Sequence, residues 1–158
     1  MTEHDRRPED ILRSLGRELP AAPTPAANYA TVRIVGDLAY TSGHGPLRDG
    51  VPLVTGKLGR DVTVEQGRES AGLTVLSLLA SLKSALGELD RVEEVVKLLV
   101  LVNATEDFAE HHLVADGASD LLAALFGDSG VHARSAIGAI SLPFGIATEV
   151  EAIFRVRV

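Results

Sequence analysis

Two charged side chains near the C-terminal end of the chain could together hold a small carboxylate and a water molecule. Arg134 begins a predicted strand, and a guanidinium offers five donors in a planar fork that matches a carboxylate. Glu149 lies on the last predicted strand, where its oxygens can accept hydrogen bonds from water. Each also has an ordinary interpretation. Arg134 could pair with an acid across a subunit boundary, and Glu149 could be solvated on the polar face of an edge strand.

The spacing of these two residues raises a geometric question. A simple hairpin with its turn near residue 143 would pair Arg134 with about Ile153. Glu149 would then stand four residues away along its strand, which is roughly 13 Å at the rise of a strand. A long arginine side chain or a site shared between subunits would close that gap, and both alternatives stay open at this point.

A polar, glycine-rich turn, Thr41–Pro46, follows the second predicted strand. Its Gly-His-Gly-Pro sequence is not a phosphate loop, because no Lys and Ser/Thr follow and no helix opens directly after it. The glycines could let a ligand approach the backbone closely, and a plain strand-exit turn is an equal alternative. Ser42, His44 and Asp61 contain the atoms of a hydrolase triad, but no Gly-x-Ser-x-Gly elbow accompanies them.

A metal site is not expected. His111 and His112 are adjacent in a predicted helix, so their side chains point about 100° apart and do not readily bind one ion. The chain has no cysteine, which removes thiolate ligands, thiol nucleophiles and disulfides. We therefore expect no metal site.

The composition also limits the partners. Acidic residues outnumber basic ones 22 to 15, for a net charge of -7, and this balance opposes binding to a phosphate backbone. The amino terminus lacks the apolar core of a signal peptide, and no apolar run approaches the ~18 residues of a membrane span. We expect a cytoplasmic protein with no nucleic-acid and no membrane partner.

Hydrophobic periodicity predicts an alternation of strands and helices after an N-terminal extension. At 158 residues the chain has the size of one domain, and we expect residues 1–27 to form the extension and residues 28–158 the domain. The predicted helices are Asp5–Leu15, Val64–Leu86 and Glu106–Phe126; the predicted strands are Tyr29–Val35, Leu38–Ser42, Val95–Val102, Arg134–Ile140 and Ala147–Val156; a Pro/Ala-rich connector covers Leu19–Ala27.

Cap residues define the ends of the two long helices. Thr63 and Gln66 fit a capping box at the start of the helix Val64–Leu86. Gly87 ends this helix. Thr105 is the expected cap of the second. The order of elements predicts an α+β fold with a mixed sheet and both long helices on one face. The remaining face has no cover within the chain, so self-association is expected.

Several motifs, in order, resemble the Rid family, the YjgF-type enamine/imine deaminases, in a branch with a longer N-terminal extension. These motifs stand here as Pro25–Tyr29, Ser42–Pro46, Gly56–Asp61, Asp116–Leu121 and His132–Ala136, followed by Leu142-Pro143 and Glu149-Val150-Glu151. The resemblance covers about Asn28 to Val158. It implies the chorismate-mutase-like α+β fold and a homotrimer with three clefts between subunits.

The resemblance also implies an activity and a set of roles. The active deaminases add water to small 2-imino or 2-enamino acids, such as 2-aminoacrylate, and release a 2-keto acid and ammonia without a cofactor. Arg134 would hold the substrate carboxylate, Glu149 would position the attacking water, and Tyr29 would reach in from the neighbouring subunit. The remaining residues expected to bind substrate are Ser42, Gly43, His44, His112, Ser135 and Ala136.

Three of these positions depart from the pattern of the deaminases. Ala136 stands where many have Cys, His44 stands where Gln is common, and His112 takes the expected place of a helical Asn. The alternatives are therefore a trimer of the same fold that binds small carboxylates without turning them over, and an endoribonuclease, which the acidic charge disfavours.

Overall fold

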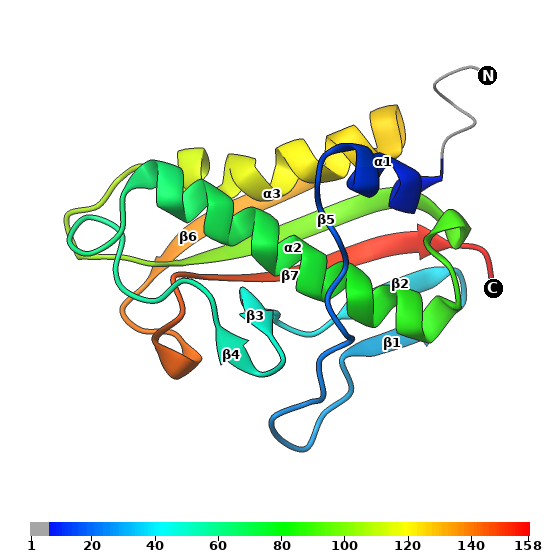
Figure 1. The fold of residues 1–158 in the computed structure, drawn as a ribbon, viewed down its shortest axis with the longest axis horizontal. Helices are drawn as coiled ribbons and strands as arrows, with labels where there is room; N and C mark the ends of the chain where they lie inside the picture. The colour runs from blue at the N-terminus through cyan, green and yellow to red at the C-terminus, as the bar shows by residue number, and fades with distance from the viewer. Residues whose placement is uncertain (1–6) are drawn as a thin grey trace.

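The computed structural model describes residues 7–158, in which two long helices pack on one face of a five-stranded sheet (Figure 1). The elements, in order, are α1 (Pro8–Ser14), β1 (Val32–Val35), β2 (Leu38–Thr41), β3 (Leu47–Arg48), β4 (Val51–Pro52), α2 (Val64–Leu86), η2 (Leu89–Arg91), β5 (Val92–Asn103), α3 (His111–Phe126), η3 (Gly127–Gly130), β6 (Ala133–Ala139), η4 (Pro143–Gly145) and β7 (Thr148–Val156). The predicted α+β class with a mixed sheet is confirmed. The first two residues of the predicted N-terminal helix lie outside the described residues.

The order of strands in the sheet is β1-β2-β7-β5-β6. β5 and β6 run parallel, and the other neighbouring pairs are antiparallel. The simple hairpin between β6 and β7 is wrong, because β5 lies between them. Arg134 pairs with Leu98 of β5, which in turn pairs with Ala152. The parallel connection through α3 and η3 carries the chain back to the start of β6.

α2 begins and ends at the residues that its predicted caps define. The Thr63 hydroxyl accepts from the Gln66 N–H at 3.1 Å, and the Gln66 side chain accepts from the Thr63 N–H at 2.9 Å, which confirms the capping box. α3 begins later than predicted, at His111, and Thr105 is not its cap. The Thr105 N–H instead donates to Leu58 O at 3.0 Å, which ties the segment before α3 to the loop before α2.

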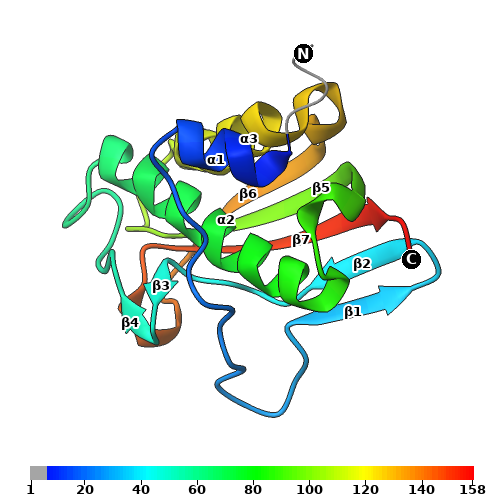
Figure 2. The same ribbon diagram turned by 45° about the vertical axis from the view of Figure 1, so that its right-hand side comes forward.

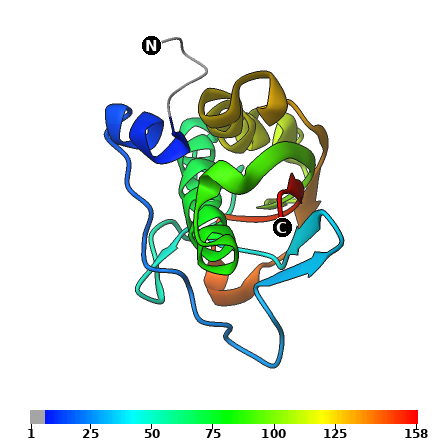
Figure 3. The same ribbon diagram turned by 90° about the vertical axis from the view of Figure 1, so that its right-hand side faces the viewer.

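Figures 2 and 3 show α2 and α3 side by side on the same side of the sheet, with α1 resting against α3. The inward side chains of the central strands are buried beneath these helices, Phe154, Leu98 and Val100 among them. The helices approach closely where α3 carries Gly117. A Cβ at this position would overlap the backbone carbonyl of Arg68 on α2.

The opposite face of the sheet has no covering element among residues 7–158. Register and alternation place a mixed set of side chains on it: Tyr40, Ile153, Lys97, Leu99, Leu101 and Ile137, with Glu149 and Glu151 alongside. Tyr40 is 41% exposed and Ile137 is 50% exposed. The expected uncovered face is therefore present. The long strand β5 is buried on the helix side and only partly covered on this one.

Candidate active site

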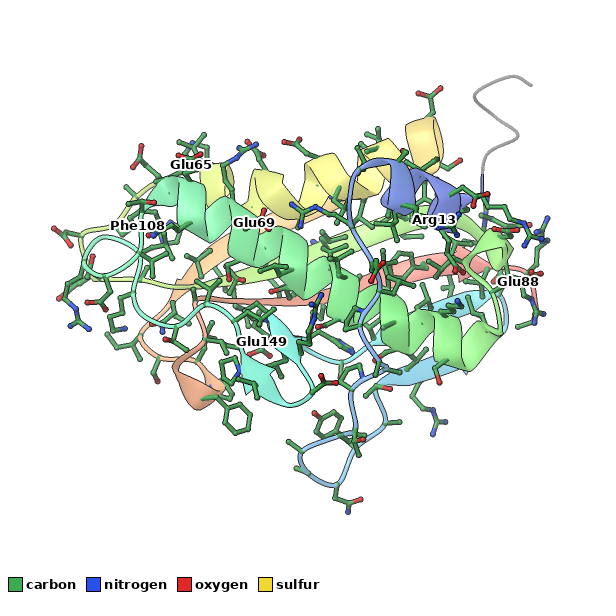
Figure 4. All side chains as sticks on the ribbon, viewed as in Figure 1. Arg13, Glu65, Glu69, Glu88, Phe108 and Glu149 are labelled. Carbon is green, nitrogen blue, oxygen red and sulfur yellow. The ribbon has the colours of Figure 1, made fainter. Side chains whose placement is uncertain are left out.

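A cavity of about 470 Å³ lies where the N-terminal connector, the end of β2 and the η4 turn meet. Glu149 of β7, labelled in Figure 4, is the only carboxylic acid among the described residues that line it, and no lysine or arginine of residues 7–158 does. Tyr29, Ser42, Gly43 and His44 line it as well. The structure therefore brings together five of the nine residues expected from the sequence to form the site.

Backbone pairing places Gly43 against Glu149. The N–H of His44 donates to Val150 O and the N–H of Val150 donates to His44 O, both at 2.9 Å. This bridge holds the backbone of residue 43 so close that any Cβ there would overlap Oε1 of Glu149. Gly43 is thus required for the approach of the carboxyl group, as is common where a backbone must come close to another group.

Burial in the apolar cavity raises the pKa of Glu149, and the nearby negative charge of Glu151 adds to the shift. A carboxyl group with a raised pKa exchanges protons closer to neutral pH, which suits a general base or acid. The hydroxyl of Ser42 is buried nearby and has no hydrogen-bond partner within the described chain. An unsatisfied buried hydroxyl in a cavity is a group to which a ligand or water can bind.

His44 is held by both ring nitrogens. Nδ1 lies 2.8 Å from Ser42 O and Nε2 lies 2.8 Å from the hydroxyl of Ser81 on α2. A carbonyl can only accept, so Nδ1 carries the proton and Nε2 accepts from Ser81. No ring nitrogen remains for a substrate, and any contact with His44 would have to use its other atoms.

We expect His44 to make the protein less stable in mild acid. Desolvation of the buried ring lowers the pKa of His44 below its ordinary value of 6.5, against a smaller raising effect of the Ser42 carbonyl. Because the unfolded chain then binds a proton more readily than the folded chain, this stabilisation is complete above pH 6.5 and is lost as the pH falls below it.

Urea unfolding of the wild type and of a His44→Gln variant at about pH 7.5 and about pH 5.5 measures this effect. The variant keeps the other histidines, so its pH dependence gives their contribution. The drop in midpoint between the two pH values should be larger in the wild type than in His44→Gln. An equal drop in both proteins would contradict the assignment.

Arg134, on β6, lies outside the cavity and forms a second cluster with residues of α3. Its Nη1 donates to Asp116 Oδ1 at 2.9 Å and to the Ser119 hydroxyl at 3.0 Å, and its Nη2 donates to the backbone oxygen of His112 at 3.1 Å. Three of its five N–H groups are engaged in this way, which leaves two for a carboxylate. The side chain of His112 is exposed, so only its backbone takes part.

Sequence reasoning missed Asp116 and Ser119 as partners of Arg134. Asp116 is the first residue of the Asp116–Leu121 motif, and this position in the motif could have identified it as a site residue. The hydroxyl of Ser119 also lies 2.9 Å from Nε2 of His132, whose Nδ1 lies 2.6 Å from Gly130 O. Nδ1 must donate to that carbonyl, so Nε2 accepts from Ser119 and leaves its oxygen free to accept from Arg134. This chain of hydrogen bonds fixes the guanidinium.

The two clusters do not meet within one chain. Glu149 is on the uncovered face of the sheet beside Leu101, whereas Arg134 reaches toward α3 from the other face beside Leu98. Ser135 lies with Arg134 on β6, where its hydroxyl accepts from Lys97 Nζ at 3.3 Å, and the half-buried Ala136 follows it. Neither lines the cavity around Glu149.

Residues 7–158 contain neither a metal-binding cluster nor a membrane-spanning helix. No group of three or more His, Asp or Glu side chains is arranged to hold a metal ion. No helix combines the length and the apolar character needed to cross a membrane.

Comparison with known proteins places this chain in a family. Protein TCP17 of Trypanosoma cruzi is 45% identical over 147 residues, which are 92% of either chain. The crystal structure of Atu1372 from Agrobacterium tumefaciens has 42% identity and a TM-score of 0.89, with 95% of this chain and 92% of that one covered. A crystal structure from Shewanella oneidensis, described as an endoribonuclease candidate, has 35% identity and a TM-score of 0.92, and covers 96% of this chain and all of its own.

Residues 9–150 match the family described as "YjgF/chorismate_mutase-like, putative endoribonuclease". That match spans most of the chain and includes both clusters, from Tyr29 and Gly43 to Arg134 and Glu149. The chain therefore belongs to the YjgF/chorismate mutase-like family, to which the Rid proteins belong.

Proposed function

We propose that this protein hydrolyses small 2-imino and 2-enamino acids to 2-keto acids and ammonia, in a cleft that two copies of the chain form together. Arg134 of one copy holds the substrate carboxylate, and Glu149 of the next copy positions the water. The observation that carries the proposal is the division of the site. A half-buried carboxyl group, whose cavity is lined by no lysine or arginine of residues 7–158, lies on one face, and a preorganised guanidinium with two donors left lies elsewhere.

The reaction needs orientation more than it needs a new electrophile. The carbon of a 2-imino acid already accepts a nucleophile, and an enamine reaches the same state when a proton is added at C3. Glu149 takes a proton from water as the water oxygen bonds to C2 of the protonated imine, which gives a neutral tetrahedral aminoalcohol. Glu149 then gives that proton to the amino nitrogen, and as the C–N bond breaks it takes the proton of the new hydroxyl group, so that ammonia leaves and the C2 carbonyl forms. Fixed donors and a placed water supply the acceleration.

The uncovered sheet face supports the assembly. Tyr40 and Ile137 expose large apolar surfaces there, with Leu99 and Leu101 between them. Lys97 on the same face bears a positive charge and Glu151 a negative one. In a closed ring of three copies, the same contact is repeated three times and covers the exposed sheet face of each copy. It would also carry Arg134 on the edge strand β6 toward the cavity of a neighbour.

Turnover of 2-aminoacrylate, generated in the assay by a dehydratase, tests the proposal. Wild type should accelerate the release of ammonia and pyruvate over the spontaneous rate. Glu149→Gln should lower kcat by about 100-fold or more, because an amide cannot take the proton. Binding of pyruvate, measured by calorimetry, should persist in this variant, since Arg134 is intact.

Glu151→Gln is the matched control, since it removes a carboxylate from the same strand and face but not from the cavity. We expect it to keep kcat within a few-fold. The acid limb of its pH profile should move to lower pH, because the negative charge that helps to raise the pKa of Glu149 is gone.

Two results would redirect the proposal. Saturable pyruvate binding without any acceleration of ammonia release would indicate a carboxylate-binding protein of the same fold. Cleavage of a model RNA that is lost in Glu149→Gln would indicate the ribonuclease activity contained in the family description. The net charge of -7 and a cavity whose carboxyl group repels phosphate both oppose the second result.

A further inference from the structure

The N-terminal segment is anchored to the helices before it reaches the cavity. Leu12 of α1 is 2% exposed and belongs to the core. Glu9 accepts from Lys83 Nζ at 2.9 Å, and Arg17 donates to both carboxylate oxygens of Glu69, at 3.1 and 2.7 Å. Figures 1 and 2 show the blue connector leaving α1, crossing α2 and turning back into β1. The segment is thus fixed to the outside of the helical layer.

Beyond these anchors the connector forms one wall of the cavity around Glu149. Pro23, Thr24, Ala26 and Ala27 line it, in a stretch where three prolines restrict the backbone. The facing wall is the η4 turn, which contributes Phe144. Phe144 has a φ of 59°, a left-handed conformation that is costly for a bulky residue and that occurs more often at functional sites.

The chemistry of this cavity is mostly apolar. None of the described residues that line it is a lysine or an arginine. Among its polar groups, both ring nitrogens of His44 are engaged, and the Ser77 hydroxyl donates to Leu47 O at 2.9 Å. A substrate carboxylate has no cation to bind among the residues that line this cavity, so the space beside Glu149 suits the side chain of the substrate rather than its carboxylate.

We propose that the connector wall, defined as residues 23–27, selects imino acids that carry an apolar side chain of four or more carbons; this rests on the proposed function. At about 470 Å³ the cavity is in the range of pockets that enclose ligands far larger than a three-carbon acid. With the carboxylate on Arg134 of the adjacent copy and C2 beside Glu149, the side chain points between the connector wall and Phe144. Each methylene placed there leaves water for an apolar surface.

The test compares imino acids formed from alanine, leucine and phenylalanine by an amino acid oxidase. Hydrolysis competes with trapping by semicarbazide, and the decrease in semicarbazone gives kcat/KM. We expect kcat/KM for the leucine-derived imine to exceed that for the alanine-derived imine by at least about tenfold. Ala27→Phe fills the cavity from the connector wall and should bring this ratio to one or below.

Ala21→Phe is the matched control, since Ala21 lies on the same connector and is exposed like Ala27, but does not line the cavity. It should keep the wild-type ratio. Equal kcat/KM values for all three imines, or a preference for the smallest that Ala27→Phe leaves in place, would overturn the inference.

A binding measurement separates this inference from the proposed function. If wild type accelerates none of the imines, the proposed hydrolysis fails. The affinities for pyruvate and 4-methyl-2-oxopentanoate, measured by calorimetry, then decide the inference alone. At least about tenfold tighter binding of the larger keto acid, lost in Ala27→Phe and kept in Ala21→Phe, supports the connector wall. Equal affinities contradict it.

Discussion

Mixing two inactive variants, Arg134→Ala and Glu149→Gln, should restore activity. If each site takes its arginine from one copy and its carboxylate from the next, an Arg134→Ala chain still supplies Glu149 and a Glu149→Gln chain still supplies Arg134. In a random mixture of equal parts, a site has one chance in two of receiving each intact residue. About one quarter of the wild-type kcat should therefore return. Each variant alone should be reduced by at least about 100-fold.

The measurement is ammonia release from 2-aminoacrylate after the two variants are unfolded together and refolded, so that subunits exchange. The double variant Arg134→Ala/Glu149→Gln, mixed with wild type in equal parts, is the control: a shared site should again keep about one quarter of the wild-type kcat, whereas a site within one chain should keep about one half. Light scattering verifies that all samples have the same mass. Activity no higher than that of the separate variants would place both groups in one chain and defeat the shared site.

The largest effect on stability is expected from Gly117→Ala. A methyl group at this position overlaps the backbone carbonyl of Arg68, which cannot rotate away as a side-chain tip could, so α2 and α3 must separate. Overpacking of this kind costs about 1–3 kcal/mol and sometimes more. The higher helix propensity of alanine offsets up to about 1 kcal/mol of it. A net loss of about 2 kcal/mol, at about 2–4 °C per kcal/mol for a domain of this size, gives an expected fall in Tm of about 4–8 °C.

Gly72→Ala is the matched substitution on the facing helix. The nearest atom to its added Cβ is the Gly117 carbonyl oxygen at 3.6 Å, which is ordinary van der Waals contact. Its Tm should therefore stay the same or rise, through helix propensity alone. Thermal unfolding should be compared at one protein concentration, because the stability of an oligomer depends on it. Equal losses in both variants would show that the close approach at Gly117 is not the cause.

The elements that were predicted correctly are those that depend on local chemistry. The reciprocal hydrogen bonds of Thr63 and Gln66 and the glycine at 87 define α2 to the residue. Thr105 misled because the segment after it does not start the helix: α3 begins only at His111, and Thr105 is instead held by its N–H to a distant partner, Leu58, which a local pattern does not reveal. The pairing expected from a simple hairpin failed for the same reason: nothing near Arg134 in the sequence indicates that Leu98, and not Ile153, lies beside it.

For the candidate site, too, the sequence predicted some features and not others. Motif order was enough to single out Arg134 and Glu149, and residue type was enough to suggest their chemistry. Residue type did not reveal that the ring of His44 is occupied by Ser42 and Ser81. It also did not indicate that Asp116 and Ser119 fix the guanidinium. Such contacts depend on how helices lie over strands, which single-sequence patterns do not define.

The place of β7 has a consequence for how the chain is made. β7 is the last strand in chain order, yet it lies between β2 and β5. Synthesis proceeds at about 5–20 residues per second, so β2 and β5 emerge several seconds before the strand that joins them. Until then both present unpaired backbone groups, which are open to pairing with other chains. We therefore expect nascent chains that stop before residue 148 to depend on chaperones, and the sheet to close only after β7 has left the ribosome.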